Sequence, residues 1–117
     1  ALDFDAHFGP SLIGQGIPFL LADMEKGAIP LAAASVDIIA MTSTLEHLGC
    51  PEHIAKEMHR LLRPGGIVFI TVPDIRKYKW NFWNDITHKR PFTDKALRFL
   101  FETHGFATVE CCSYNHN

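Results

Sequence analysis

Two short apolar runs on either side of a helical segment constrain the fold of this chain more than any other feature. The first covers residues 36–41 and is interrupted only by Asp37, and the second covers residues 67–72. Neither run alternates polar with apolar residues, and continuous apolar strands are typical of parallel sheets that are covered on both faces. Residues 51–62, between them, repeat apolar side chains at helical spacing. The pattern therefore predicts a strand, a helix and a second, parallel strand.

The helix between these runs has its own start and stop signals. Pro51 suits a first helical turn, and Glu52 beside it complements the helix dipole. The expected buried stripe consists of Ile54, Ala55, Met58, Leu61 and Leu62. The opposite, solvent-facing side is expected to hold Lys56, Glu57 and Arg60. The sequence Pro64-Gly65-Gly66 is expected to stop the helix before the next strand.

The remaining segments extend the alternation of strands and helices. Residues 17–23 form an apolar run that ends in an acid and predict a buried strand. Residues 74–92 are expected to be long and irregular. The Thr93 hydroxyl can cap a second helix, and residues 106–114 are expected to form a last strand. This order predicts one α/β domain with an open, mostly parallel sheet, in which ligands bind at the carboxyl ends of the strands.

Composition excludes several classes of protein. The 117 residues fit one domain, and 47% of them are hydrophobic, so a disordered or low-complexity chain is excluded. A net charge of −2 gives no overall attraction to nucleic acid. No apolar stretch reaches the roughly 18 residues of a membrane span, and no signal peptide is recognised. The three cysteines are a poor disulfide framework, which favours free thiols and a cytoplasmic protein.

Three linked motifs resemble class I S-adenosylmethionine-dependent methyltransferases. They are Ser35-Val36-Asp37-Ile38-Ile39, Leu45-Glu46-His47-Leu48, and the run from Arg60 to Ile70 that contains Arg63-Pro64-Gly65-Gly66. The segment Asp85-x-Thr87-His88-x-Arg90-Pro91-Phe92-Thr93 resembles one bacterial branch of that family. The resemblance implies a Rossmann-like fold, S-adenosylmethionine as cofactor, and methyl transfer to a small, polar acceptor molecule.

One family motif is missing from the chain. The glycine-rich loop G-x-G-x-G, which follows the family's first strand, has no counterpart, since Gly14-Gln15-Gly16 is interpreted as a turn. Residues 1–117 are therefore expected to form a single, partial methyltransferase domain. Its sheet would be incomplete at the N-terminus, and the family's last strand is not found after Asn117. The alternative is a non-catalytic methyltransferase-like module that a partner chain completes, and exposed strand edges would also allow a homo-oligomer.

The resemblance assigns several residues to the cofactor. Asp3 would match the acid that binds both ribose hydroxyls, because a carboxylate offers two acceptor oxygens, although Asp5 competes for this role. Asp23 would accept a hydrogen bond from the adenine amino group, and Met24 would pack on the ring. The simpler interpretation of Asp23 is a loop cap.

Further candidates follow the second strand. Thr42 and Ser43 would lie beside the methionine part and the sulfonium of the cofactor, or form a simple turn. His47 can accept a proton from an acceptor molecule, and Glu46 could orient it. A neutral, structural histidine is the competing interpretation of His47. His88 is a weaker candidate on the substrate side, with a structural role in its loop as the alternative.

No metal site and no nucleic-acid partner are expected. Some relatives use an E-x-x-E-H arrangement with a later histidine as a metal site, but Ser43 replaces the first acid here and is a poor ligand. His47, Cys50 and His53 lie three residues apart, a spacing that suggests a zinc site. A structural zinc site normally needs four ligands, and these residues supply only three. Basic and aromatic residues alternate in residues 74–92, where a substrate loop is favoured over nucleic-acid binding.

Overall fold

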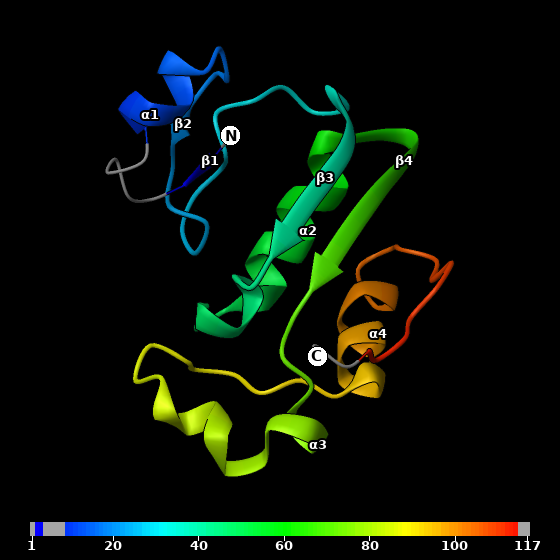
Figure 1. Ribbon diagram of the computed structural model, residues 1–117. Helices are drawn as coiled ribbons and strands as arrows, with labels where there is room; N and C mark the ends of the chain where they lie inside the picture. The colour runs from blue at the N-terminus through cyan, green and yellow to red at the C-terminus, as the bar shows by residue number, and fades with distance from the viewer. Residues whose placement is uncertain (1, 4–8, 115–117) are drawn as a thin grey trace.

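The chain folds around two pairs of parallel strands. The computed structural model describes residues 2–3 and 9–114. Strand β1 (Leu2–Asp3) pairs with β2 (Leu20–Leu21), and β3 (Val36–Thr42) pairs with β4 (Leu62–Thr71), both in parallel. Figure 1 shows the β1–β2 pair set apart from the β3–β4 pair, with the short helix α1 (Gly9–Gly14) beside it. The predicted α/β fold with parallel strands is confirmed, as two pairs rather than one sheet.

The β3–α2–β4 unit matches the central prediction from the sequence. Helix α2 (Pro51–Leu61) connects the two strands and covers one face of the pair. Its buried stripe joins the main hydrophobic core, which takes Met41 from β3 and, as partly buried members, Ile39, Val68 and Ile70 from the strands. Helix α2 begins at Pro51 as expected. It ends at Leu61, since Leu62 has extended backbone angles.

The proline–glycine segment lies inside β4 rather than between helix and strand. The register passes from Val36 opposite Leu62 to Ile38 opposite Ile67, so the residues between Leu62 and Ile67 form a bulge. Gly65 in this bulge has a φ of 81°, which an L side chain rarely adopts. The sequence signal therefore marks an irregularity within the strand.

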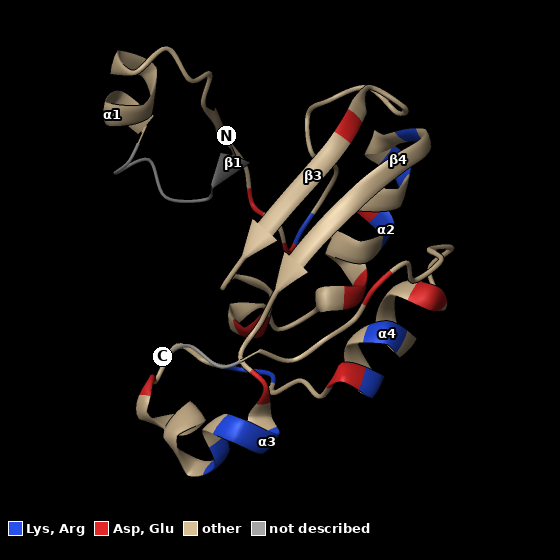
Figure 2. Cartoon of the chain, turned by 45° about the vertical axis from the view of Figure 1, so that its right-hand side comes forward, with Lys and Arg blue, Asp and Glu red and all other residues tan. Residues whose placement is uncertain are grey.

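The second face of the β3–β4 pair carries exposed apolar side chains. Ile38, Ile67 and Phe69 are 66%, 60% and 58% exposed. Apart from the exposed ion pair of Asp37 and Arg63 near the amino ends, the residues of both strands are uncharged (Figure 2). Parallel strands are usually covered on both faces. Within the described residues only one face is covered, which departs from the expectation of two.

Helix α4 (Asp94–Glu102) confirms a second helical prediction. The Thr93 hydroxyl accepts a hydrogen bond from the backbone N–H of Ala96 and caps the helix. Leu100 and Phe101 enter the core, and Phe101 packs edge-on against Phe106. No helix in residues 9–114 is long and apolar enough to cross a membrane.

Three expected segments differ in the structure. The strand expected over residues 17–23 is reduced to the two residues of β2. Residues 106–114 form no strand, because they make no ladder with any described strand. Residues 74–92 contain two short helices, α3 (Ile75–Tyr78) and η3 (Lys79–Asn84), where an irregular loop was expected. Asp74 caps α3 by accepting a hydrogen bond from the backbone N–H of Arg76.

Glu57 is buried, although the helical pattern placed it on the solvent side. Its carboxylate accepts hydrogen bonds from the backbone N–H of Ile29 (2.7 Å) and from the guanidinium of Arg60. Arg60 also donates to the carbonyls of Ile29 and Leu31. The hydrogen bond from Arg60 lowers the pKa of Glu57. This network attaches the loop before β3 to α2, and helical periodicity alone does not reveal such a partner.

Replacement of Glu57 tests this network. Glu57→Ala leaves the Ile29 N–H without its acceptor, and we expect the free energy of unfolding to fall by about 2 kcal/mol in urea titrations. The matched control is Lys56→Ala, at an exposed position of the same helix, which should change it by less than about 0.5 kcal/mol. Equal stability of the two variants would contradict the structural role of Glu57.

The same carboxylate predicts a pH dependence of stability. Because its pKa is lower in the folded state than the ordinary 4.5, its contribution is complete above about pH 4.5 and is lost as the pH falls through the folded value. Urea titrations of wild type and Glu57→Gln between pH 7 and pH 3 should therefore converge on the acid side. A stability difference that stays constant or grows in acid would refute this assignment.

Candidate functional site

An open hollow lies between β2 and β3, along the edge of β3 that does not pair with β4. Its walls come from the residues around β2, from β3 and from the buried stripe of α2, including Leu21, Met41 and Met58. Polar groups collect at the carboxyl ends of the two strands, where Asp23, Thr42, Ser43, Thr44 and His47 line the hollow. This is the edge at which open parallel sheets bind ligands. We call it the β2–β3 hollow.

The backbone turns sharply at the end of β3. Ser43 has a φ of 48°, which is uncommon for a residue other than glycine and is often found at functional sites. Its backbone N–H donates to the carbonyl of Thr71 on β4, and the Thr44 hydroxyl donates to the carbonyl of Thr42. Ser43 also lines a second hollow, with Asp74, Tyr78 and Phe92 among its other residues. The turn after β3 therefore separates two hollows.

The residues proposed for the adenosine lie on or after β1 and β2. Asp23 is exposed, and its Oδ1 accepts a hydrogen bond from the backbone N–H of Glu25 at 2.8 Å. Met24 is buried in the core and also lines the β2–β3 hollow. The backbone of Asp3 pairs with Leu21. Asp5 lies outside the described residues.

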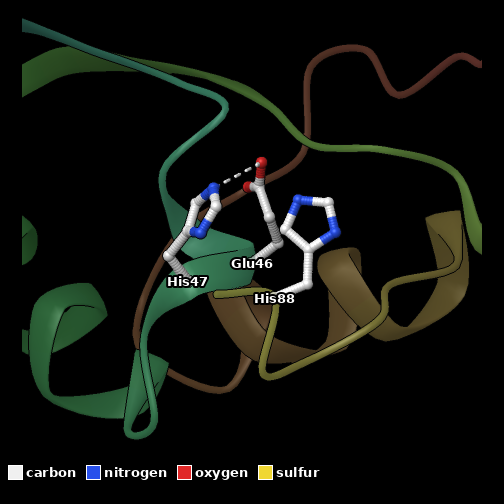
Figure 3. A group of neighbouring side chains, drawn as sticks. All are labelled: Glu46, His47 and His88. Carbon is white, nitrogen blue, oxygen red and sulfur yellow. Dashed lines mark ion pairs between the residues drawn. The ribbon is translucent and has the colours of Figure 1, made fainter. Parts of the chain in front are cut away.

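Glu46, His47 and His88 form a compact cluster next to the hollow. Glu46 and His47 belong to the short 3₁₀ helix η2 (Leu45–His47), and His88 comes from the segment after η3. One potential ligand atom from each residue lies within 4.8 Å of the others. Figure 3 shows the three side chains turned toward one another. The fold therefore brings His88 next to Glu46 and His47, which precede it by about 40 residues in the sequence.

Backbone hydrogen bonds hold the segment of His88 against η2. The backbone N–H groups of Lys89 and Arg90 donate to the carbonyl of Glu46 at 2.8 and 3.1 Å. The ring of His88 stacks on Phe82, which is fully buried, with ring centroids 4.3 Å apart. The position of His88 is thus set by main-chain contacts and by a buried aromatic ring.

Thr87 and Asp85 orient His47. The Thr87 hydroxyl lies 2.8 Å from Nδ1 of His47 and donates its own proton to Oδ1 of Asp85. The hydrogen bonds from Thr87 lower the pKa of Asp85. The motif resemblance included both residues, but their contact with His47 depends on the loop conformation and could not be read from the spacing.

Cys50 and His53, which follow His47 at intervals of three residues, do not belong to this cluster. His53 Nε2 lies 2.7 Å from the carbonyl of Gly27, and Cys50 is an exposed free thiol. Within the described residues, Glu46, His47 and His88 are the one group of three such side chains close enough together to hold a metal ion.

A second charged cluster lies beside the smaller hollow. Asp74 binds the guanidinium of Arg76 at 3.0 Å and accepts a hydrogen bond from the Ser113 hydroxyl. Arg76 also pairs with Asp94. The hydrogen bond from Arg76 holds the pKa of Asp74 far below its ordinary value. These contacts connect α3, α4 and the C-terminal segment, a network that the sequence patterns did not indicate.

Comparison with known proteins identifies relatives in sequence. Residues 5–70, more than half of the chain, match the family described as "Methyltransferase domain". A protein of Mycolicibacterium smegmatis with the name "Probable S-adenosylmethionine-dependent methyltransferase" is 29% identical over 90 residues. An uncharacterized methyltransferase of Mycobacterium bovis is 35% identical over 63 residues. The alignments cover 75% and 54% of this chain but only 35% and 24% of the relatives, so the chain spans about a third or less of their length.

Solved structures agree on the fold. A Thermotoga maritima methyltransferase, described as a possible histamine N-methyltransferase, has a TM-score of 0.79 at 24% identity, covering 92% of this chain and 54% of that one. A Haloferax volcanii methyltransferase in complex with the activator Trm112 has a TM-score of 0.76 at 19% identity, covering 89% and 48%. The [4+2]-cyclase SpnF has a TM-score of 0.71 at 21% identity, covering 87% and 38%. The fold is Rossmann-like, and the chain belongs to the methyltransferase domain family.

Proposed function

We propose that this chain carries part of the active site of an S-adenosylmethionine-dependent methyltransferase with a small, polar acceptor. The observation that carries the proposal is the collection of Asp23, Thr42 and Ser43 at the carboxyl ends of β2 and β3, around one hollow. Family membership supports the same chemistry. The fold alone does not, because one fold supports many functions.

The residues present fit the adenosine and sulfonium parts of such a cofactor. The β2–β3 hollow combines apolar walls with a carboxylate, hydroxyls and a turned backbone, as ligand pockets commonly do. S-adenosylmethionine would supply a methyl group on a positively charged sulfur. In this proposal Asp23 accepts a hydrogen bond from the adenine, Met24 contributes to the apolar wall, and Asp3 accepts from the ribose. The oxygens of Thr42 and Ser43 favour the positive sulfur.

The acceptor side is proposed at Glu46, His47 and His88. His47 lines the hollow, and its Nε2 lies 3.6 Å from Oε1 of Glu46. His47 can therefore take a proton from an acceptor hydroxyl or amine, with Glu46 stabilising the charged imidazole. Thr87 positions the ring. His88, stacked on Phe82, would complete the wall on this side.

A second candidate function is a non-catalytic module that another chain completes. The exposed apolar side chains Ile38, Ile67 and Phe69 favour this candidate, because such a face is usually covered in parallel sheets. The chain also spans only about half of the similar Thermotoga maritima structure. In this case the hollow would not bind cofactor in the isolated chain.

Titration with S-adenosylhomocysteine separates the two candidates. We expect saturable heat in calorimetry for the wild type. Asp23→Ala should weaken binding roughly tenfold or more, because a hydrogen bond to a charged group contributes about 1.5–3 kcal/mol. The matched control is Asp37→Ala, an exposed acid near the other end of β3, which should bind as the wild type does.

Two results would decide against the proposal. No heat from a chain that unfolds cooperatively would favour the completed module over the enzyme. Equal weakening by Asp23→Ala and Asp37→Ala would show that the ligand does not contact the carboxyl end of β2.

A further inference from the structure

Glu46 is a buried acid with one unpartnered carboxylate oxygen. Its side chain is 1% exposed, and its Oε2 has no hydrogen-bond partner among residues 2–3 and 9–114. A buried carboxylate oxygen without a partner is costly, and buried polar groups in native proteins are nearly always paired. Oε2 of Glu46 therefore needs a hydrogen-bond donor or a cation that the described side chains around it do not supply.

Two imidazole nitrogens with free lone pairs face this carboxylate. His47 Nδ1 lies against the carbonyl (3.2 Å) and the hydroxyl of Thr87, and His88 Nδ1 lies 2.6 Å from the carbonyl of Phe82. A carbonyl only accepts hydrogen bonds, so this network assigns the proton of each neutral ring to Nδ1. The Nε2 atoms then carry lone pairs, and both are on the side of Glu46 in Figure 3.

Histidines that bind metal ions in proteins commonly show this arrangement, with Nδ1–H bonded to an acceptor and Nε2 free for the metal. Ligating histidines usually donate their other N–H to a carbonyl, a carboxylate or water, which fixes the tautomer and the ring orientation. Here Thr87 and Phe82 provide those acceptors, and stacking on Phe82 fixes the His88 ring further. Two such rings next to a buried carboxylate form a ligand set known for zinc and for iron(II).

We propose that Glu46, His47 and His88 bind a divalent first-row transition-metal ion. The 3.6 Å between His47 Nε2 and Glu46 Oε1 agrees with two bonds of about 2.1 Å at an angle near 120°. Separations of up to 4.8 Å within the set exceed the roughly 4.2 Å that two such bonds can span. Because His47 and Glu46 already lie within reach of a shared ion, the separations that involve His88 would have to shorten by a few tenths of an ångström when the ion binds.

This inference departs from the expectation of no metal. That expectation rested on Ser43 in place of an acidic ligand, whereas the proposed set uses His88 and does not need residue 43. Three protein ligands leave a coordination position open, as in catalytic zinc sites. In an enzyme of the proposed function, an oxygen of the acceptor could occupy it, and the ion would then replace His47 in activating that oxygen. This last step rests on the proposed function, but metal binding does not.

Protonation of the two histidines is the alternative to a metal ion as a source of positive charge beside Glu46 and Asp85. Asp85 Oδ2 lies 3.6 Å from His88 Nε2, so two carboxylates face two imidazoles. Protonation of both rings would form two ion pairs. The neighbouring cations are engaged elsewhere, since Lys89 lies 4.0 Å from Glu25 and Arg90 lies 3.5 Å from Glu52. Only a direct measurement of metal uptake distinguishes an ion from two protons.

Titration of the 117-residue chain with Zn²⁺ and with Co²⁺, without cofactor or acceptor, tests the inference. We expect one saturable site, and the visible spectrum of bound Co²⁺ should indicate nitrogen and oxygen ligands rather than thiolates. His88→Gln and His47→Gln should each weaken binding at least tenfold, because even residues that only orient metal ligands contribute about 10- to 100-fold. Either variant suffices if the other fails to fold.

The matched control is His104→Gln. Its Nδ1 also lies 2.6 Å from a carbonyl, that of Leu100, but it is outside the cluster. Wild-type affinity in this variant supports the site. No uptake by the wild type, equal affinity in His88→Gln and His104→Gln, or a thiolate spectrum would overturn it. Since S-adenosylhomocysteine binding is measured separately, either proposal can fail while the other stands.

Discussion

The parallel pairing of β3 with β4 is the constraint on which the rest of the structure depends. Pairs from Ile38–Ile67 to Thr42–Thr71 bring both strands to the same carboxyl edge. Helix α2 can connect the strands only by returning along one face, where its apolar stripe forms the core. The polar residues after β3 then necessarily lie at the edge where ligands bind.

A smaller set of main-chain contacts completes the candidate site. The carbonyl of Glu46 accepts two backbone N–H groups from the segment after His88, and this brings the loop of residues 85–90 against η2. These bonds place His88 beside Glu46, although the two residues are far apart in the sequence. The proposed acceptor side and the proposed metal site therefore depend on the same loop.

Local patterns predicted the parts of the fold that depend on local physics. The β3–α2–β4 unit and the Thr93 cap follow from apolar runs, helical spacing and a hydroxyl before a helix. Residues 106–114 have the composition of a strand but pair with no described strand, and such pairing depends on tertiary placement that composition does not reveal. Glu57 looked solvent-facing because its partner, the Ile29 N–H, lies 28 residues earlier in the sequence. Such long-range partners are invisible to periodicity.

In the candidate site, too, local sequence patterns identified individual residues but not the long-range contacts between them. The sequence singled out Glu46, His47 and His88 individually, through their residue types and through motif resemblance. Their convergence, the unpartnered oxygen of Glu46 and the contact of His47 with Thr87 all depend on loop conformation. The side-chain geometry added what the sequence motifs lacked, namely which atoms of these residues face one another.

Cofactor binding at the carboxyl edge of β2 and β3 is tested most directly by backbone amide NMR spectra of the ¹⁵N-labelled chain, recorded during addition of S-adenosylhomocysteine. We expect the largest shifts at residues 22–25 and 42–48, with the signals of Asp37 and Arg63, near the opposite end of the strands, unchanged. Shifts confined to the opposite end, or no shifts in a folded chain, would contradict it.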